Sequence, residues 1–520
     1  MSFYRSSGIL IHPTSLPSND GIGSLGKAAY EWIDWLESAA QRIWQILPFG
    51  PTEADGSPYS SISAFAGNPL WIDLEDLHQR SYLSAKALNS YRKLTPDRER
   101  VDYKWLNDHK MAILWTAFMG MQEKTEDIAV KLKAFEQEHD FWLPDYAMFR
   151  ALADINSTLN WVEWSKGVHP QTKQYAGDEY VSKEIANEVA RRKAFHIFTQ
   201  FIFAEQWMGL REYAQNKRVK IIGDIPIYVS YKSSDVWANQ HLFQLDKYGV
   251  PVEVAGVPPD YFSVSGQKWG NPLYDWDAMR IHGFQWWRKR YSHLLKYMDI
   301  ARIDHFRGIQ AYWAIPHAEE TAVNGSWRLG PGVDLLNALL EEDPQGSKIP
   351  DWESPLSIIA EDLGFITPPV RKVKDALRLP GMAILQFGLE GAQEFLPENI
   401  DPNTVAYTGT HDNNTTRGWW DDGVKKGADL HISALLEHYN SSPSSSVSWQ
   451  LIELTWRSSA RIAIAPMQDI LDLDANHRMN IPGSATGNWS WRLNGDLLTL
   501  SVANRLKEVS IQSGRSFVSY

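Results

Sequence analysis

Short apolar segments rich in β-branched residues recur along the chain, and polar residues follow each of them closely. Eight segments have this pattern: residues 8–13, 42–51, 219–229, 298–306, 356–364, 381–388, 404–413 and 460–471. Continuous apolar runs of this length are typical of strands buried on both faces. Amphipathic helical patterns lie between them, for example at 28–40, 283–298 and 448–460. Alternating strands and helices predict the α/β class, and eight strands predict a (β/α)8 TIM barrel.

Two intervals are too long for simple barrel connections, so the single domain 1–520 is predicted to carry two insertions. The interval 52–218 includes helical segments such as 104–139 and predicts a mostly helical inserted subdomain. A second insertion is expected at 230–280. Its stretch GVPPDYFSVSGQKWGNPLYDW (256–276) combines stiffening prolines with glycine hinges. It is therefore interpreted as a lid over the active site, or alternatively as an ordinary surface loop.

Composition narrows the possible classes of function. A net charge of −12 gives no basic surface for nucleic acid or anionic lipid. The absence of cysteine excludes disulfides, iron–sulfur clusters and a cysteine nucleophile. No apolar run approaches the roughly 20 residues that span a bilayer, and the first residues do not resemble a secretory signal. We therefore expect a cytoplasmic protein without a membrane partner.

The 24 tryptophans fit either a large core or a cleft that stacks flat rings against sugars.

Candidate chemistry gathers where the predicted strands end. In a (β/α)8 barrel the carboxyl ends of the strands form the active site. Four of these ends carry carboxylates, in the segments IIGDIPIY, IARIDHF, IIAEDLG and YTGTHDN: Asp224, Asp304, Glu361 with Asp362, and Asp412, which follows His411. Several acids on separate strands of one barrel favour a catalytic site.

Arg302 and Asp304 share one face of their strand because side chains alternate along it. A neighbouring guanidinium favours an ionised carboxylate and should lower the pKa of Asp304, as a nucleophile requires. Glu361 has no basic neighbour in sequence, and nearby Asp304 and Asp412 would favour its protonated form. That form suits a general acid. Two carboxylates about 5–5.5 Å apart carry out retaining glycoside chemistry.

Alternatives remain at this point. Asp–Arg pairs at strand ends can simply neutralise each other, and acids with a histidine can bind a metal. The chain has neither dense D-x-D-x-D spacing nor H-E-x-x-H, so no metal site is predicted. The segment SPYSSISAFAGNPLW (57–71) follows the second strand and is either a turn or a loop whose Tyr59 forms a platform for a sugar ring.

Taken in order, the motifs SPYSSISAFAGNP, GDIPIYV, VPPDYFS, GQKWGNPLY, RIDHFRG, IIAEDLG, GTHDN and RMNIPG resemble a known family. The chain is similar to the 4-α-glucanotransferases, also called amylomaltases or disproportionating enzymes, of glycoside hydrolase family seventy-seven in the α-amylase clan. The resemblance spans nearly the whole chain and is weak only at 75–215. It implies that Asp304 is the nucleophile, Glu361 the general acid and base, and Asp412 a stabiliser of the transition state.

The resemblance also implies a set of substrate-binding residues around the cleavage point, in the arching loop, and on the acceptor side. These are Tyr59, Asp224, Arg302 and His411; Tyr261 and Phe262; and Gln267, Trp269, Asn271 and Asn480. His305 and Arg307 are expected only to support the site. The resemblance implies neither a cofactor nor a metal, and no carboxy-terminal β-sandwich domain. The expected substrates are α-1,4-glucans and malto-oligosaccharides. A hydrolase of the same clan and a non-catalytic glucan-binding scaffold remain alternatives, and the oligomeric state is left open.

Overall fold

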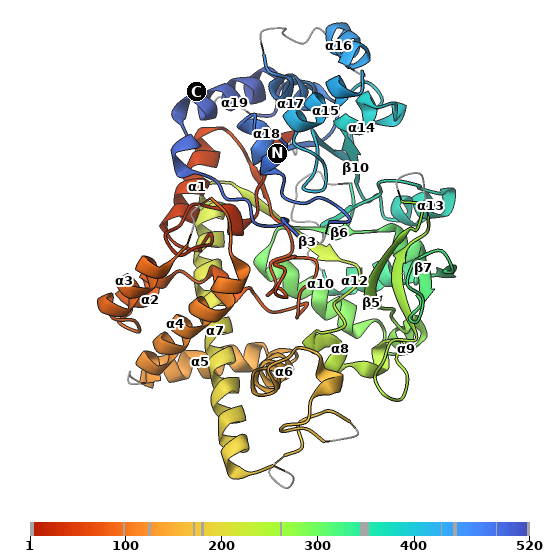
Figure 1. Ribbon diagram of the computed structural model, residues 1–520. Coiled ribbons are helices and arrows are strands. Elements are labelled where there is room, and N and C mark those ends of the chain that lie inside the picture. The colour runs from red at the N-terminus through yellow and green to blue at the C-terminus, as the bar shows by residue number, and fades with distance from the viewer. Residues whose placement is uncertain are drawn as a thin grey trace.

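A barrel of parallel strands forms the centre of the molecule (Figure 1). The computed structural model describes residues 5–96, 99–122, 126–169, 172–177, 181–259, 263–343, 353–427, 429–439, 445–484 and 486–516. The barrel strands are β1 (Ser6–Leu10), β2 (Ile43–Gln45), β3 (Lys220–Pro226), β6 (Ile300–Asp304), β9 (Ile358–Ala360), β10 (Gly381–Ile384), β11 (Thr404–Tyr407) and β12 (Ile462–Pro466). Each of the eight predicted segments contains or overlaps one of these strands, so the predicted barrel is confirmed.

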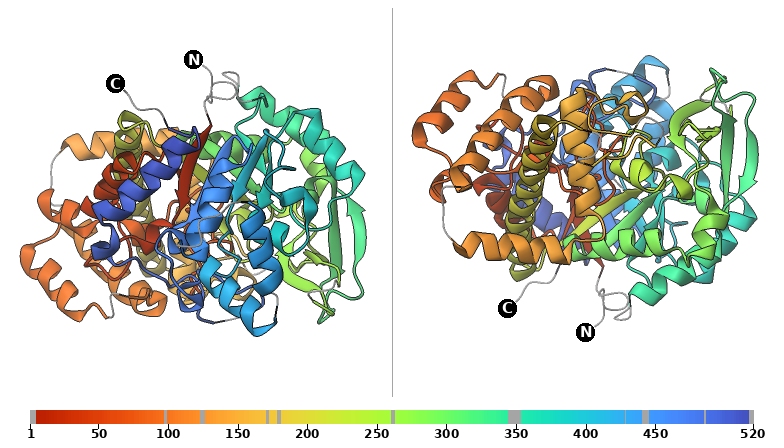
Figure 2. Two further views of the ribbon diagram at one scale, coloured as in Figure 1. Left: turned by 90° about the horizontal axis from the view of Figure 1, so that it is seen from above. Right: turned by 90° about the horizontal axis from the view of Figure 1, so that it is seen from below.

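The barrel brings the two ends of the chain together. Its hydrogen-bonded order is β10-β11-β12-β1-β2-β3-β6-β9, and Ser6 of β1 lies opposite Ile462 of β12. The Ala360 amide donates a hydrogen bond to the Pro380 carbonyl at 2.9 Å, which joins β9 to the residue just before β10. Figure 2 shows β1, in red, beside the blue carboxy-terminal elements.

Helices cover the outside of the barrel, and tryptophans fill the space between the two layers. The main covering helices are α1 (Lys27–Ser38), α10 (Gln285–Tyr297), α13 (Pro368–Ala376), α17 (Val447–Arg457) and α19 (Leu500–Gln512). Trp32 of α1 stacks on Trp35 at 5.4 Å and meets Trp44 of β2 at 6.4 Å. Eight of the twelve largest fully buried side chains are tryptophans, so a large core accounts for much of the aromatic content.

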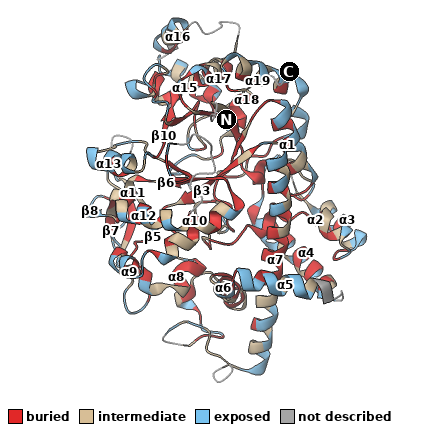
Figure 3. Cartoon of the chain, turned by 180° about the vertical axis from the view of Figure 1, so that it is seen from behind, coloured by how far each residue is buried: buried red, intermediate tan, exposed pale blue. Residues whose placement is uncertain are grey.

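Between β2 and β3 more than half of the described chain is helical. It forms α2 (Leu74–Gln79), α3 (Ala85–Leu94), α4 (Tyr103–Gln122), α5 (Glu126–Glu138), α6 (Leu143–Asn156) and α7 (Lys183–Asn216). The second half of α7 is buried against the barrel and the other helices, whereas its first turns extend into solvent (Figure 3). The predicted helical stretch 104–139 is two helices, α4 and α5. The division of the chain into a barrel and two inserted subdomains stays a prediction.

A second, antiparallel sheet lies beside the barrel and was not expected from the sequence. Its strands, in the order β5-β4-β7-β8, are β4 (Glu253–Val257), β5 (Gln267–Pro272), β7 (Ala311–Pro316) and β8 (Ser326–Leu329). Ala255 of β4 lies opposite Ala314 of β7. The region 230–280 is therefore bound to residues that follow β6, the strand that carries Asp304.

Shorter helices complete the described chain. They are α8 (Ser234–Ala238), α9 (Trp276–Ile281), α11 (Arg307–Gln310), α12 (Val333–Glu342), α14 (Leu385–Leu389), α15 (Thr416–Lys425), α16 (Asp429–His438) and α18 (Met467–Ile470). Within the described ranges, no helix has the length and apolar character needed to cross a membrane.

Arg515, which is 1% exposed, holds the carboxy terminus against the closing strands of the barrel. Its guanidinium donates hydrogen bonds to five carbonyls, those of Ser6, Trp456, Ser458, Ala460 and Arg461.

We expect Arg515→Met to lower the free energy of unfolding by about 3 kcal/mol, because buried carbonyls lose their donor. Urea unfolding followed by circular dichroism measures the change. Lys507→Met, at an exposed position of α19, is the matched control, and an equal effect in both variants would contradict this role.

Candidate active site

The buried guanidinium of Arg302 joins two carboxylates at the mouth of the barrel. Its Nη1 lies 2.6 Å from Asp224 Oδ2 and its Nη2 lies 2.8 Å from Asp304 Oδ1. The side chain of Asp224 is 0% exposed and that of Asp304 is 30% exposed. Asp224 and Arg302 therefore lie inside the barrel, and Asp304 lies one layer above them, facing the opening. The predicted pairing of Arg302 with Asp304 is present.

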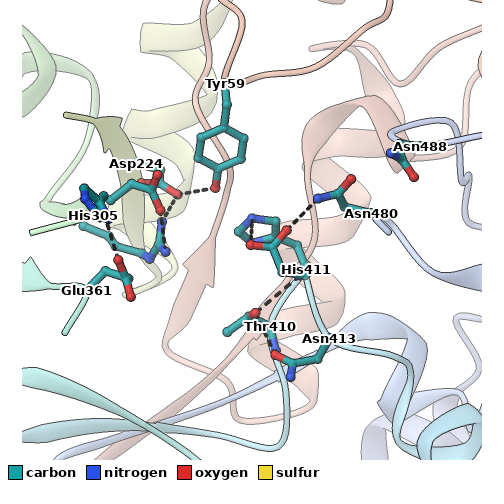
Figure 4. A network of polar contacts seen from close by, with 12 residues as sticks. Tyr59, Asp224, His305, Glu361, Thr410, His411, Asn413, Asn480 and Asn488 are labelled. Atoms are coloured by element: carbon teal, nitrogen blue, oxygen red, sulfur yellow. Dashed lines mark hydrogen bonds and ion pairs between the residues drawn. The ribbon is translucent and has the colours of Figure 1, made fainter. Parts of the chain in front are cut away.

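Tyr59 extends this network across the barrel mouth (Figure 4). Its hydroxyl donates a hydrogen bond to Asp224 Oδ2 at 2.8 Å. Its ring stacks on the His411 ring at 5.3 Å, with 16° between the planes. The Trp489 ring lies 5.8 Å from Tyr59 and 6.0 Å from His411. The loop after β2 and the loop after β11 are thus joined by packed rings beside the carboxylates.

Glu361, at the end of β9, is held by backbone amides. His305 has a φ of 52°, in the left-handed region, where a residue other than glycine is uncommon. In this conformation the His305 amide donates to Glu361 Oε2 at 2.8 Å, and the Leu363 amide donates to Oε1 at 3.0 Å. The turn that ends β6 therefore fixes the Glu361 carboxyl beside Asp304.

Burial is the main cause of the shifted pKa values of the carboxyls and imidazoles at this site. Burial, together with the charge of Asp304, raises the pKa of Glu361 to about 7, although Arg302 opposes the shift. Burial likewise raises the pKa of Asp224 to about 7, against the effect of Arg302. Burial lowers the pKa of His305 to about 4 and also lowers that of His411, so both imidazoles are neutral at pH 7. Glu361 can therefore hold a proton near neutral pH, as a general acid must.

Asp412 occupies a more open position on the other side of the mouth. Its side chain is 47% exposed, and its Oδ2 lies 3.3 Å from His411 Nε2. Asn480 donates to Asp412 Oδ1 at 2.6 Å, and Arg478 donates to the Asp412 carbonyl at 2.9 Å. Asp412 is thus held mainly by residues from a loop near the carboxy terminus.

The predicted residues of β5 approach the site from the second sheet. The Trp269 ring meets the His305 ring edge-on at 4.9 Å, and its Nε1 donates to Gln267 Oε1 at 3.1 Å. Asn271 donates to the Val229 carbonyl at 2.8 Å, which ties β5 to the segment after β3. The predicted lid residues Tyr261 and Phe262 lie outside the described residues.

Sequence reasoning missed two contacts, those made by Arg478 and Trp489. Both belong to the segment 478–491, where Asn488 Oδ1 accepts a hydrogen bond from the Ile481 amide at 2.9 Å and holds the loop together. No strand or sequence spacing relates this loop to Asp412. Only the RMNIPG motif, through Asn480, pointed to it.

Among the described residues, no group of three or more histidines and acids is arranged to hold a metal ion. The site instead pairs an ion-paired carboxylate, Asp304, with a partly buried carboxyl of raised pKa, Glu361. A nucleophile and a general acid can act together in this arrangement.

Comparisons with known proteins agree across the chain. The profile of a glycoside hydrolase family 77, described as "4-alpha-glucanotransferase", matches residues 11–499. The chain is 41% identical to a 4-alpha-glucanotransferase of Synechocystis over 98% of both chains. It is also 41% identical to one of Thermus thermophilus over 95% of both. A chloroplastic/amyloplastic 4-alpha-glucanotransferase of Solanum tuberosum is 40% identical over 94% of this chain and 82% of its own.

Solved structures give the same result for the fold. An amylomaltase from Streptococcus agalactiae, in complex with acarbose, superposes with a TM-score of 0.89 and 35% identity over 99% of this chain and 100% of its own. An amylomaltase from Corynebacterium glutamicum superposes with a TM-score of 0.77 over 98% of this chain and 75% of its own. At 17% identity the second structure supports the fold alone.

Replacing Arg302 with methionine tests the central ion pairs. We expect Arg302→Met to lower the free energy of unfolding by about 3–5 kcal/mol, because Asp224 and Asp304 lose their cation. Without Arg302 the folded-state pKa of Asp224 rises further above its unfolded value. A carboxyl with a raised folded pKa stabilises the fold at low pH and loses that contribution as pH rises. The deficit should therefore be smaller at pH 5 than at pH 8.

Urea unfolding at both pH values measures this effect. Arg280→Met is the control, because Arg280 forms an exposed pair with Asp277 worth about 0–1 kcal/mol. If Arg302→Met were no more destabilising than Arg280→Met, or were more destabilising at pH 5 than at pH 8, the role of Arg302 would be wrong.

Proposed function

The chain belongs to the 4-alpha-glucanotransferase family, glycoside hydrolase family 77, and acts on α-1,4-glucans, and we propose that its reaction is a retaining double displacement carried out by Asp304 and Glu361. The observation that carries this proposal is the contrast between the two side chains. Asp304 is ion-paired with Arg302, whereas Glu361 is partly buried beside it, forms no ion pair with the described residues and has a pKa of about 7. Family membership, predicted from the ordered motifs, is confirmed.

In the first half of the reaction, a carboxylate oxygen of Asp304 attacks the anomeric carbon of the donor glucan. The bond from that carbon to the glycosidic oxygen breaks, and Glu361 gives its proton to the departing oxygen. The products are a glucosyl ester on Asp304 and a shortened glucan with a free 4-hydroxyl. Two amide donors fix the Glu361 carboxyl, so the proton is delivered from one position.

In the second half, the 4-hydroxyl of an acceptor glucan attacks the same anomeric carbon. Glu361, now ionised, takes the hydroxyl proton, and the ester bond to Asp304 breaks. A new α-1,4 bond forms, and two inversions leave the configuration unchanged. Malto-oligosaccharides are the proposed short donors and acceptors, and the cytoplasm is the proposed location.

The remaining site residues are proposed to position the sugar at the cleavage point. Asp412, half exposed at the mouth, would accept hydrogen bonds from sugar hydroxyls that strengthen as charge develops on the ring. Tyr59 offers the face of its ring, and Asp224 and Arg302 hold that ring and Asp304 in place. Trp269, half exposed on β5, would contact the acceptor together with Gln267 and Asn271, and Tyr261 and Phe262 would cover the glucan.

The products formed from maltotriose distinguish transfer from hydrolysis. Transfer yields glucose and longer oligomers with little net gain in reducing ends, because each broken bond is replaced. Hydrolysis yields glucose and maltose with a steady rise in reducing ends, and that result would overturn the proposed second half. A non-catalytic scaffold would leave maltotriose unchanged.

Asp304→Asn tests the nucleophile. We expect kcat/KM for maltotriose to fall by about 10³-fold or more, because the amide cannot form the ester. The fold should persist, since Arg302 keeps its bond to Asp224. Asp277→Asn, whose side chain is 92% exposed on α9, is the control and should retain full activity. Near-normal turnover of Asp304→Asn would disprove the assignment.

The pH dependence tests the acid. The free enzyme must enter the first half with Glu361 protonated, so kcat/KM should decline as pH rises through about 7. Asp224 has a similar pKa. The variant Glu361→Gln therefore decides which of the two groups causes the decline in kcat/KM. This variant should use maltotriose very poorly. It should still release fluoride from α-maltosyl fluoride as the maltosyl ester forms on Asp304, because this leaving group needs no proton, and kcat/KM for that release should not decline at pH 7. If kcat/KM of this variant for the fluoride still declined at pH 7, a group other than Glu361 would be the cause.

A further inference from the structure

The helices α6, α8, α9 and α10 lie on one side of the molecule (Figure 1). Residues from these helices and the loops beside them line a cavity of about 280 Å³, and none of the three proposed catalytic carboxylates lines it. Three of its aromatic walls are Phe65, from the loop after β2, Trp142, from the start of α6, and Trp286, from α10. Polar side chains complete the lining, among them Asp235 of α8 and Lys289 of α10. Aromatic faces and both signs of charge therefore meet in one enclosed space.

Some of these polar groups lack partners among the described residues. Asp235 is 4% exposed, and its Oδ2 accepts a hydrogen bond from the Ala64 amide at 2.8 Å. Burial raises the pKa of Asp235 to about 6. The Trp286 Nε1 is buried without an acceptor. Lys289 lies 5.2 Å from the centre of the Phe141 ring and forms no ion pair with the described residues. The cavity lining thus combines a carboxylate with an ammonium group that forms no ion pair with the described residues.

One class of ligand suits this combination. A simple anion would be repelled by the carboxylate of Asp235, and a simple cation would be repelled by the ammonium of Lys289. Neither kind of ion therefore interacts favourably with both side chains. Hydroxyl groups donate to a carboxylate and accept from an ammonium or an indole N–H. A sugar ring also has an apolar face that packs on aromatic rings. We propose that this cavity binds one glucosyl unit, at a site separate from the cleft that contains Asp304.

The cavity is built onto the elements that hold the cleft. Ala64, which binds Asp235, belongs to the same loop as Tyr59, whose hydroxyl holds Asp224. Buried Arg290 lies over the Trp286 ring at 5.4 Å and donates to the Pro226 carbonyl at 2.8 Å, and Pro226 lies opposite Asp304. A sugar in the cavity would therefore contact two supports of the cleft. This proposal does not depend on the roles assigned to Asp304 and Glu361.

Reductive methylation of lysines, read residue by residue by mass spectrometry, tests occupancy of the cavity in solution. The probe is methyl α-glucoside, which has no α-1,4 bond to be transferred and no aldehyde to react. At about ten times its Kd, it leaves about a tenth of the cavities empty, so methylation of Lys289 should slow roughly tenfold. Lys296 lies on the same helix, is paired with Glu138 and does not line the cavity, so its rate should not change.

The variant Asp235→Asn, labelled in the same way, distinguishes protection by a sugar in the cavity from protection by a sugar in the cleft. It should lose most of the protection of Lys289, because the amide no longer offers a charged acceptor to sugar hydroxyls. Equal methylation of Lys289 with and without the probe in the unaltered protein would overturn the proposal. Protection that persists in Asp235→Asn would also overturn it, because the effect would then come from another site.

Crystals of the unaltered protein soaked in methyl α-glucoside give a second measurement that needs no variant. The expected result is a sugar ring in the cavity, with hydroxyls within hydrogen-bonding distance of Asp235 and Lys289. A sugar in the cleft of the same crystal shows that the soak reached the protein. A cleft that holds sugar beside a cavity that holds only water would overturn the proposal.

Discussion

The arrangement of the site depends on one buried cation. Asp224 and Asp304 occupy neighbouring strands at the barrel mouth, where two carboxylates would repel each other in a poorly hydrated interior. Arg302 lies between them and bonds to both. Because Asp224 is fixed in this way, it can also accept the hydroxyl of Tyr59, which in turn stacks on His411. Arg302 on β6 is therefore connected, through Asp224 on β3, to the loops that follow β2 and β11.

The three proposed catalytic carboxylates sit in different surroundings, although all follow barrel strands. Glu361 is partly buried, is held by two amides, and owes its raised pKa mainly to the loss of hydration. Asp304 is anchored from below by Arg302. Asp412 is half exposed and depends on Asn480 and Arg478 from a distant loop. The site thus combines a rigid pair on β6 and β9 with a third member whose position depends on the carboxy-terminal loops.

The sequence was most informative where burial on both faces leaves a continuous apolar run. The eight strands are apolar on both faces, so all of them could be recognised, together with the acids that follow them. The second sheet could not, because β5 and β8 are largely exposed and β5 includes Gly270 and Pro272, which weaken any strand pattern. Arg478 and Trp489 were missed because their contacts depend on how a long loop folds back. The left-handed turn at His305, which aims an amide at Glu361, has no glycine to mark it.

The pairing of β1 with β12 has a consequence for the synthesis of the protein. Ser6 is made long before its partner Ile462, because most of the sequence lies between them. Contacts so distant in sequence are slow to form and leave strand edges unpaired in the meantime. The segment that holds Asp412 comes later still. A nascent chain therefore cannot begin to rearrange glucans until residues 478–480 have been made, and until β12 appears one edge of β1 lacks its partner strand.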